Sequence, residues 1–421
     1  MSRIGRVLCL SLCIALCAGS LAFATGQSEA RQSDVVTLTI WEHAPQFEAP
    51  LRASVEQFME LNPDIRVEYE IKMDEQYYNL LFTAIQAGAA PDLFWTHGTK
   101  TEHLGQIVAQ GAAMDLTGKI DISVYPPLQA DVAFVDGRLY MNPGASVGTR
   151  AVYYNKDIFD EHGLSVPTTW DEFIALNEAL SENGVVPMSM AGNSFWATLF
   201  HFEPILVSVA PDFIRDATER RIPLDDPRFI NALSTMVEWG QNGWYGRDYL
   251  GVDTGGQLLA FSSGRVAMTI TGSWNADTIQ RNNPNLNVGA FQIPDGSGVR
   301  PMVVTADSGF SIYSNTEHPD EALRLLTWLN SVEAQEIWVN TLGLVPGIPQ
   351  ITATNPLVQE IADHDEQVES IYTLLGYYPA RGNVLPRQVF QEDLQKVLSG
   401  ALTPQEFARS IDAQVDWDSV D

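Results

Sequence analysis

The first part of the chain beyond residue 34 alternates between strand-like and helix-like hydrophobic patterns. Residues 36–40 form a short run of β-branched and aliphatic side chains, and residues 65–71 alternate apolar with polar positions, as strands do. Between them, apolar residues recur at helical spacing: Leu51, Val55, Phe58 and Met59. A second helix is predicted over 77–87 and a third strand over 93–95. This β-α-β-α-β order predicts a mainly parallel sheet with both faces covered by helices.

Later segments continue the α/β style. Thr169 is a predicted N-cap before the acidic first turn that begins at Trp170. Further helices are predicted over 229–240, from 319 to about 339, and after Thr403, with proline at the first helical position. No repeat or linker-like segment divides the remainder of the chain. Two lobes without such a seam would require the chain to cross between them more than once.

The N-terminal segment has the pattern of a secretion signal. Two arginines precede an apolar stretch over 7–16 that is too short to span a bilayer, and residues 22–24 (Ala-Phe-Ala) fit a cleavage site. We therefore predict a signal peptide over 1–24, a flexible tether over 25–33, and a periplasmic location. A lipid anchor through Cys17 is the alternative.

Charge and cysteine content exclude several classes of function. Lys and Arg total 24 against 53 Asp and Glu, and a net charge of −29 argues against nucleic-acid binding and against docking on anionic lipid. All the cysteines, Cys9, Cys13 and Cys17, lie in the predicted signal. A chain cut after Ala24 would have neither disulfides nor a thiol nucleophile.

Motifs for catalysis or cofactor binding are missing from the sequence. There is no G-x-S-x-G elbow and no glycine-rich phosphate-binding loop. His97 and His103 are six residues apart, which does not place them on one helix face at metal-ligand spacing. We expect no enzyme activity, no metal and no cofactor. Acidic pairs such as Asp225-Asp226 give only a weak indication of glycosidase carboxylates.

Tryptophans close to strand ends and turns are the strongest functional signal. Three follow predicted strands and one follows the turn at 192–194: Trp41, Trp95, Trp274 and Trp196. Strand ends in α/β sheets are where ligands bind. Each tryptophan has neighbouring Asn, Thr, Ser or His side chains. Flat rings suit the C–H faces of a sugar, and the polar groups suit its hydroxyls.

Several motifs, taken in order, resemble the extracellular solute-binding proteins of ABC sugar importers, the group that includes maltodextrin-binding proteins. They are 38–41 (LTIW), 87–95 (AGAAPDLFW), 136–140 (DGRLY), 152–157 (VYYNKD), 167–172 (PTTWDE), 261–268 (FSSGRVAM), 271–274 (TGSW) and 343–346 (GLVP). The resemblance implies a two-lobed periplasmic-binding-protein fold (type II), in which each lobe is a mainly parallel sheet flanked by helices and several hinge crossings join the lobes. The lobes are expected at 34–147 with 305–350, and at 148–304 with 351–421. A carbohydrate would bind in the cleft between them, and the partner would be an ABC transporter permease.

The same resemblance assigns candidate ligand-binding residues to both lobes. His43, Trp95, Thr96 and Thr99 would lie on the first lobe. The second would contribute Asn193, Phe195, Trp196, Gly272 and Trp274. By the same resemblance Trp170 and Tyr154 are packing residues, and Tyr377 or Tyr378 could add a further cleft aromatic.

Departures from the maltodextrin-binding pattern affect the choice of ligand. Gly98, Thr99 and Gly148 stand where those proteins carry charged residues, which argues against maltose and leaves another mono- or oligosaccharide open. A receptor for a glycerophosphodiester or a polyamine is an alternative, although none of the cleft motifs supplies an Arg or Lys for phosphate. An exported glycan-degrading enzyme is a second alternative. A monomer is the simplest expectation for the oligomeric state.

Overall fold

A computed structural model describes residues 35–72, 76–99, 102–144, 146–219, 222–305 and 308–420. The predicted signal peptide (1–24) and tether (25–33) lie outside the described residues. Among the described residues, no single helix is long and apolar enough to cross a membrane. Only one pair of helices, 195–209 with 211–218, meets that test jointly, and this pair is bent by 100°.

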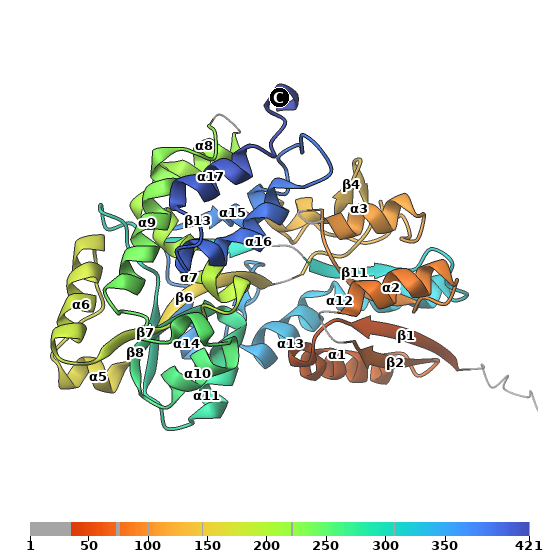
Figure 1. Ribbon diagram of the computed structural model, residues 1–421. Helices are drawn as coiled ribbons and strands as arrows, with labels where there is room; N and C mark the ends of the chain where they lie inside the picture. The colour runs from red at the N-terminus through yellow and green to blue at the C-terminus, as the bar shows by residue number, and fades with distance from the viewer. Residues whose placement is uncertain are drawn as a thin grey trace, which may run out of the picture. The chain divides into compact units, whose positions relative to one another are not determined.

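The first sheet contains the strands expected from the N-terminal pattern. Its order is β11-β3-β1-β2, where β1 is Val36–Glu42, β2 Ile65–Ile71, β3 Leu93–His97 and β11 Ser308–Ile312. Strand β1 pairs parallel with β2 and β3, whereas β11 runs antiparallel to β3. Helices α1 (Glu48–Leu61) and α2 (Tyr77–Gln86) connect the parallel strands, which confirms the β-α-β-α-β prediction (Figure 1). Trp41 and Trp95 lie inside β1 and β3 rather than beyond them.

The second sheet has the order β13-β10-β6-β8-β7, with β9 and β12 also paired to β6. Its strands are β6 (Ser146–Asn155), β7 (Val186–Ser189), β8 (Val266–Gly272), β9 (Val288–Phe291), β10 (Pro301–Thr305), β12 (Val345–Pro346) and β13 (Glu366–Glu369). The pairs β7/β8 and β10/β13 are parallel, but β6 runs antiparallel to β8, β9, β10 and β12. This sheet is therefore mixed, which corrects the expected mainly parallel arrangement. Strand β6 enters directly from the first sheet, without a crossover helix that would make it parallel.

The order of the described strands requires the chain to pass between the two sheets three times. Residues 142–144 bond to the backbone of β11, and the chain then continues into β6 of the second sheet. It returns between β10 and β11, and it leaves the first sheet again between α13 (Val332–Leu342) and β12. Several crossings were expected, while the exact lobe boundaries at 147/148, 304/305 and 350/351 stay a prediction.

Helix boundaries follow local capping signals. Thr169 accepts a hydrogen bond from the Glu172 amide at the start of α6 (Trp170–Glu182). Thr403 forms a capping box with Glu406 at α17 (Pro404–Asp412), where the N-cap was expected. The prediction of a single helix from 319 to about 339 is wrong, because two helices cover this range. The chain forms α12 (Pro319–Leu329) and then α13, because Ser331 adopts an extended conformation and caps a new helix through the Ala334 amide. The other helices are α3 (Glu102–Ala109), α4 (Pro127–Ala130), α5 (Lys156–Glu161), α6 (Trp170–Glu182), α7 (Phe195–Val209), α8 (Pro211–Thr218), α9 (Pro227–Gln241), α10 (Thr254–Ser262), α11 (Ala276–Asn282), α14 (Pro356–Ile361), α15 (Ile371–Leu374), α16 (Pro386–Leu398) and α17 (Pro404–Asp412).

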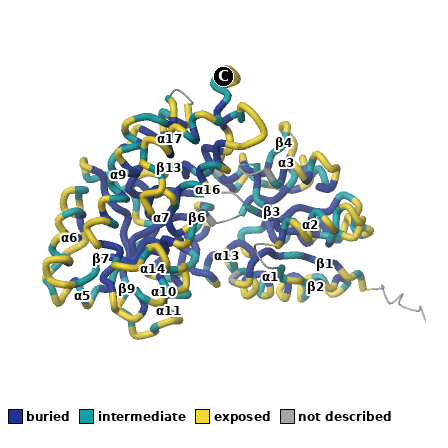
Figure 2. Tube along the Cα trace, in the orientation of Figure 1, coloured by how far each residue is buried: buried dark blue, intermediate teal, exposed yellow. Residues whose placement is uncertain are grey.

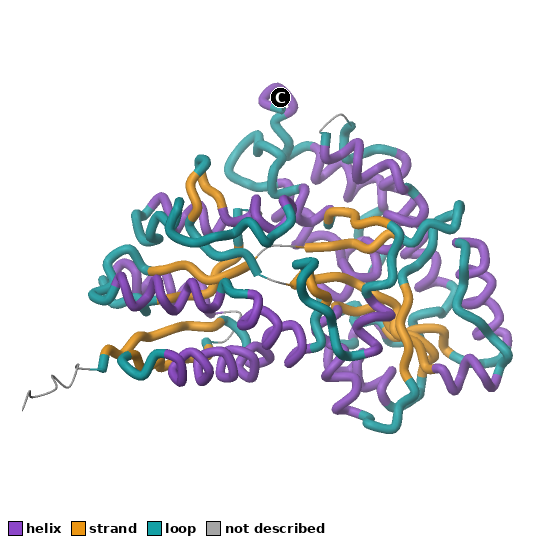
Figure 3. The backbone as a smooth tube through the Cα atoms, turned by 180° about the vertical axis from the view of Figure 1, so that it is seen from behind, coloured by secondary structure: helices purple, strands orange, loops and turns teal. Residues whose placement is uncertain are grey.

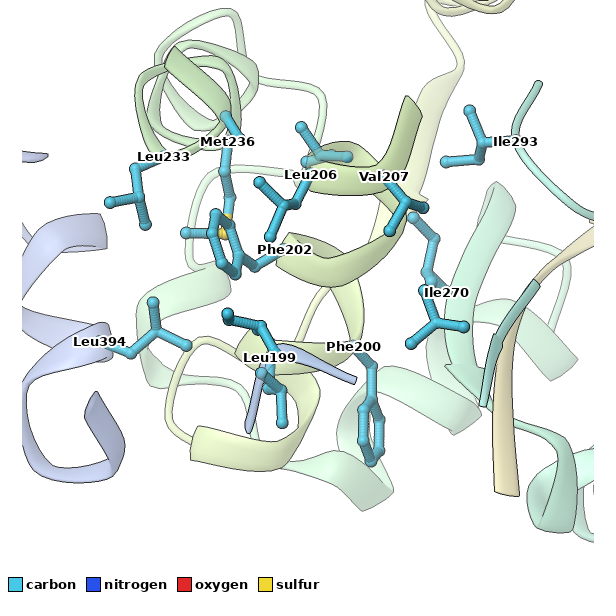
Figure 4. Close-up of a cluster of buried hydrophobic side chains, with 14 of the residues drawn as sticks. Leu199, Phe200, Phe202, Leu206, Val207, Leu233, Met236, Ile270, Ile293 and Leu394 are labelled. Carbon is cyan, nitrogen blue, oxygen red and sulfur yellow. The ribbon is translucent and has the colours of Figure 1, made fainter. Parts of the chain in front are cut away.

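Each sheet has its own hydrophobic core. The first core gathers side chains of β1, β3, α1 and α12, and the second is centred on α7. In the close-up, Leu206 and Phe202 of α7 lie near Met236 of α9, while Val207 lies toward Ile270 of β8 (Figure 4). Most strands near the sheet centres are buried and most helices expose one side, whereas α7 is buried almost throughout, as the burial colouring and the secondary-structure view help to follow (Figures 2 and 3). These cores hold the loops and strand ends that line the cavity described next.

Candidate ligand-binding site

A cavity of about 860 Å³ is lined by residues of both sheets and their helices. This volume lies within the range of about 300–1,000 Å³ that is usual for small-molecule sites. Aromatic rings line it from both sides. Those associated with the first sheet are His43, Phe47, Trp95, His97, Phe310 and Trp338, and those associated with the second are Trp196, Phe200, Trp274 and Tyr372.

A stacked histidine and tryptophan form the centre of the first wall. The imidazole of His43 lies over the indole of Trp95 with ring centroids 3.5 Å apart and an interplanar angle of 14°. The two residues meet because His43 follows β1, and Trp95 belongs to its parallel neighbour β3. His43 bonds through Nδ1 to Oε1 of the buried Glu42 at 2.5 Å, and its backbone amide donates to the same oxygen. The ring is thus held at a defined angle beside the cavity.

His97 also lines this wall, and Tyr78 and His103 pack behind it. The hydroxyl of Tyr78 lies 2.8 Å from Nδ1 of His97, and the Tyr78 ring stacks on His103 with centroids 3.5 Å apart. Burial lowers the pKa of His97 well below its ordinary value, and the nearby His43 and His103 lower it further. His97 is therefore neutral near pH 7. Among the described residues, no group of three or more His, Cys, Asp or Glu side chains could hold a metal ion.

The second wall is built on the start of α7 and the end of β8. Ser194 caps α7 by accepting a hydrogen bond from the Ala197 amide, and both residues line the cavity. Trp196 in this first turn is 45% exposed, which leaves its ring available for a ligand. Phe200, one turn further along, contacts the Trp274 ring edge-to-face at 5.4 Å. The indole of Trp274 lies over two glycines, Gly272 and Gly148.

Arg150 of β6 is a lining residue that the sequence analysis missed. Its Nε lies 2.7 Å from Oε2 of Glu203, and both side chains are at most 2% exposed. The guanidinium also lies 4.7 Å from the centre of the Phe200 ring. Burial raises the pKa of Glu203, and the charge of Arg150 opposes that shift. None of the cleft motifs named from the sequence contains Arg150, so this charge was not part of the predicted site. Its signal in the sequence was a lone charged residue in a strand with no other Lys, Arg, Asp or Glu.

Four of the nine predicted site residues line the cavity: His43, Trp95, Trp196 and Trp274. The others lie outside the lining. Thr96 is buried in β3 and its hydroxyl bonds to the His97 carbonyl, while the backbone amides of Thr99 and Asn193 bond to Val132 and Val252. Phe195 packs against Phe390. Gly272 contributes by accommodating the Trp274 ring. Ligand contact by any of the nine stays a prediction.

Other aromatic predictions have separate outcomes. Trp170 stacks on Trp239 at 5.9 Å and Tyr154 contacts Phe159 at 4.6 Å, so both pack as expected. The C-terminal aromatic in the cavity wall is Tyr372 rather than Tyr377 or Tyr378. Sequence reasoning also missed Trp338 and a set of amides in the lining. The amides are Gln129, Asn142, Gln335 and Gln391, whereas Asn275, also in the lining, directly follows Trp274 in a motif that the sequence did indicate. No local motif marks Trp338 or the other amides, because they converge only through the chain crossings.

Known proteins resemble this chain in sequence and in fold. The chain is 26% identical over 334 residues to the multiple sugar-binding protein of Streptococcus mutans, covering 77% of this chain and 78% of that protein. RafE, solved in complex with raffinose, superposes with a TM-score of 0.72 at 23% identity, covering 90% of this chain and 98% of RafE. The maltotriose-bound MalE domain from Bdellovibrio bacteriovorus gives a TM-score of 0.68 at 19% identity, with 90% and 98% covered.

These structural similarities confirm the two-lobed α/β fold expected from the sequence. A family model described as bacterial extracellular solute-binding protein matches residues 44–336, which is more than half of the chain. The protein is therefore a member of the bacterial extracellular solute-binding protein family.

Proposed function

We propose that this protein is a receptor that binds a mono- or oligosaccharide in the cavity and delivers it to the permease of an ABC importer. The observation that carries the proposal is the placement of aromatic rings on both walls of one cavity, His43 on Trp95 opposite Phe200 and Trp274. Rings of this kind stack on the apolar faces of sugars, and the interspersed amides and hydroxyls match sugar hydroxyls. Contacts made by both lobes at once would favour the closed state.

The relatives support the same ligand class. They include a multiple sugar-binding protein, a melibiose/raffinose/stachyose-binding protein of Bacillus subtilis, and structures solved with raffinose or maltotriose. The permease itself is inferred from the resemblance to ABC importers. Cleavage after Ala24 would release the receptor into the periplasm, whereas lipidation of Cys17 would tether it. The mass of the mature N-terminal peptide distinguishes the two.

A thermal-shift screen with raffinose, stachyose, maltotriose and simple hexoses tests the proposal. A ligand that binds only the native state at 100 times its Kd adds about 2.7 kcal/mol to the free energy of unfolding, so at least one sugar should raise the Tm by several degrees. Calorimetric titration then measures the affinity. If no carbohydrate shifts the Tm and titration detects no heat, the proposal is overturned.

An exported glycan-degrading enzyme is the second candidate, and the same sugars test it. Such an enzyme needs two carboxylates facing the scissile bond. Within the described part of the chain, no Asp or Glu lines the cavity, which favours the receptor. Incubation with oligosaccharides followed by an assay of reducing ends should show no turnover. Release of new reducing ends would replace the receptor proposal with the enzyme.

A further inference from the structure

Arg150 is a charged side chain in a cavity wall made mostly of rings, amides and hydroxyls. It is 2% exposed, yet it lines the cavity. Its position in β6 is opposite Gly272 at the end of β8, next to the residues that support Trp274. A buried charge is costly unless other groups satisfy it. The contacts of this guanidinium therefore indicate what the site accepts.

Three contacts fix the orientation of the Arg150 guanidinium. Glu203 Oε2 lies 2.7 Å from Nε, and Nη1 donates to the Thr305 hydroxyl at 3.3 Å. The face of the group lies over Phe200, and both Phe200 and Glu203 belong to α7 (Figure 4 shows Phe200 on this helix). Groups from α7 and β10 thus hold this β6 side chain in one conformation, so that little entropy remains to be lost on binding.

Part of the guanidinium remains available to a ligand. An arginine carries five N–H donors in a planar fork. Among the described residues, the hydrogen bond and the ion pair involve only Nη1 and Nε. The rest of the fork can donate to an oxygen in the cavity. A hydrogen bond from a charged donor is roughly twice as strong as one between neutral groups.

The positive charge of Arg150 is already balanced within the protein. Glu203 is fully buried beside it and accepts a hydrogen bond from the Ser370 hydroxyl. A carboxylate or phosphate on the ligand would bring a second negative charge into this low-dielectric site, at a cost that a hydroxyl does not incur. An ammonium group would find no carboxylate among the described lining residues. The balance favours an uncharged ligand.

We propose that Arg150 is a specificity residue that donates a charge-assisted hydrogen bond to one hydroxyl of an uncharged sugar, and that its pairing with Glu203 selects against acidic and amino sugars. This rests on the proposed carbohydrate-binding function. It adds that the sugar is uncharged and that Arg150 recognises one of its hydroxyls.

Two variants separate the role of Arg150 in binding from a role in folding. Arg150→Lys keeps the charge but loses the fork. The pair Arg150→Met with Glu203→Leu removes both charges together, and such buried pairs are often replaced without loss of stability. Arg228→Lys is the matched control, because Arg228 pairs with Asp216 and Asp226 outside the cavity. Circular dichroism and the Tm of each protein without ligand check that the fold is retained.

Calorimetric titration uses the neutral sugar with the largest thermal shift, its monodeoxy derivatives, its uronic acid and its amino derivative. We expect Arg150→Lys to weaken binding of the parent sugar at least tenfold, and Arg228→Lys to leave it unchanged. The native protein should reject one deoxy derivative at least tenfold, and the paired variant should reject that derivative less than threefold. The uronic acid and the amino derivative should both bind more weakly than the parent.

Other outcomes overturn this inference in identifiable ways. If the native protein and the paired variant lose the same affinity for each deoxy derivative relative to the parent sugar, Arg150 does not recognise a hydroxyl. Tighter binding of the uronic acid than of the parent would show an anion site instead of a neutral one. Tighter binding of the amino derivative would likewise refute selection against cations. Binding of a neutral sugar that Arg150→Lys leaves unchanged would remove only this inference, whereas the absence of binding by any sugar would remove the proposed function as well.

Discussion

The indole of Trp274 lies directly against the backbone of Gly272, so closely that a β-carbon at position 272 would lie 2.3 Å from a ring atom. No side chain fits at that distance while the ring keeps its place. Gly148 supports the same ring, since a β-carbon there would meet it at 3.2 Å. The absence of side chains at these glycines therefore sets the position of an aromatic plate in the cavity wall.

Gly272→Ala should displace the Trp274 ring and weaken sugar binding at least tenfold. Gly105→Ala in α3 is the control, because a β-carbon there has nothing within 4 Å. That control should leave affinity unchanged and raise the free energy of unfolding by about 0.5–1 kcal/mol through helix propensity. Titration and urea denaturation measure the two quantities. Unchanged affinity in Gly272→Ala would show that the ring position does not matter for the ligand.

Trp274→Ala removes this indole ring from the cavity wall. We expect at least a tenfold loss of affinity, since an aromatic ring stacked on a sugar contributes about 1–3 kcal/mol, and a nearly unchanged Tm for the protein without ligand. Trp41→Ala is the matched control, because Trp41 lies outside the cavity lining. Its ring packs under Lys72, whose Nζ lies 4.3 Å from the ring centre. Calorimetric titration measures the affinity of each variant for the sugar. Equal affinities would remove Trp274 from the binding site.

His201 should make the protein lose stability in mild acid. Burial lowers its pKa to about 4 from 6.5. Above pH 6.5 the imidazole is neutral in both states, and its contribution is fully present. Between pH 6.5 and 4 the unfolded chain takes up a proton that the native protein does not, so stability falls by about 3 kcal/mol as the pH drops.

His201→Phe removes this dependence while keeping a ring against Tyr245. Urea denaturation at pH 7.0, 5.5 and 4.5 should give a shallower decline for the variant than for the native protein. Both proteins retain Glu203 and the surface carboxylates, so these contributions cancel in the comparison. Parallel declines would mean that His201 is protonated in the native state as readily as in the unfolded chain.

Thr403→Ala should lower the free energy of unfolding by about 1 kcal/mol, the usual value of an N-cap. The Thr403 hydroxyl accepts from the Glu406 amide at 3.2 Å, and the Glu406 carboxylate accepts from the Thr403 amide at 2.9 Å. Thr403→Ser keeps the capping oxygen and serves as the control. Chemical denaturation should rank the serine variant close to the native protein; equal losses in both variants would point to the lost methyl group instead.

Local patterns were sufficient for features that depend on neighbours in the chain. Spacing and side-chain chemistry within one or two turns were enough to predict the strand over 36–40 and the helix over 77–87. The same holds for the helix caps at Thr169 and Thr403. The family resemblance came from such motifs in order, and the two-lobed fold is confirmed. The break at Ser331 was missed because apolar positions continue through it on both sides.

The sequence by itself determined the α/β class, the family and the tryptophans near strand ends, because each is written in short stretches of chain. Only the tertiary structure decided which side chains share one cavity. Arg150, Trp338 and Tyr372 meet there because the chain crosses between its sheets at widely separated points, and no local spacing encodes that convergence. The direction of β6 has the same origin, since it depends on where the strand enters the sheet rather than on its own residues.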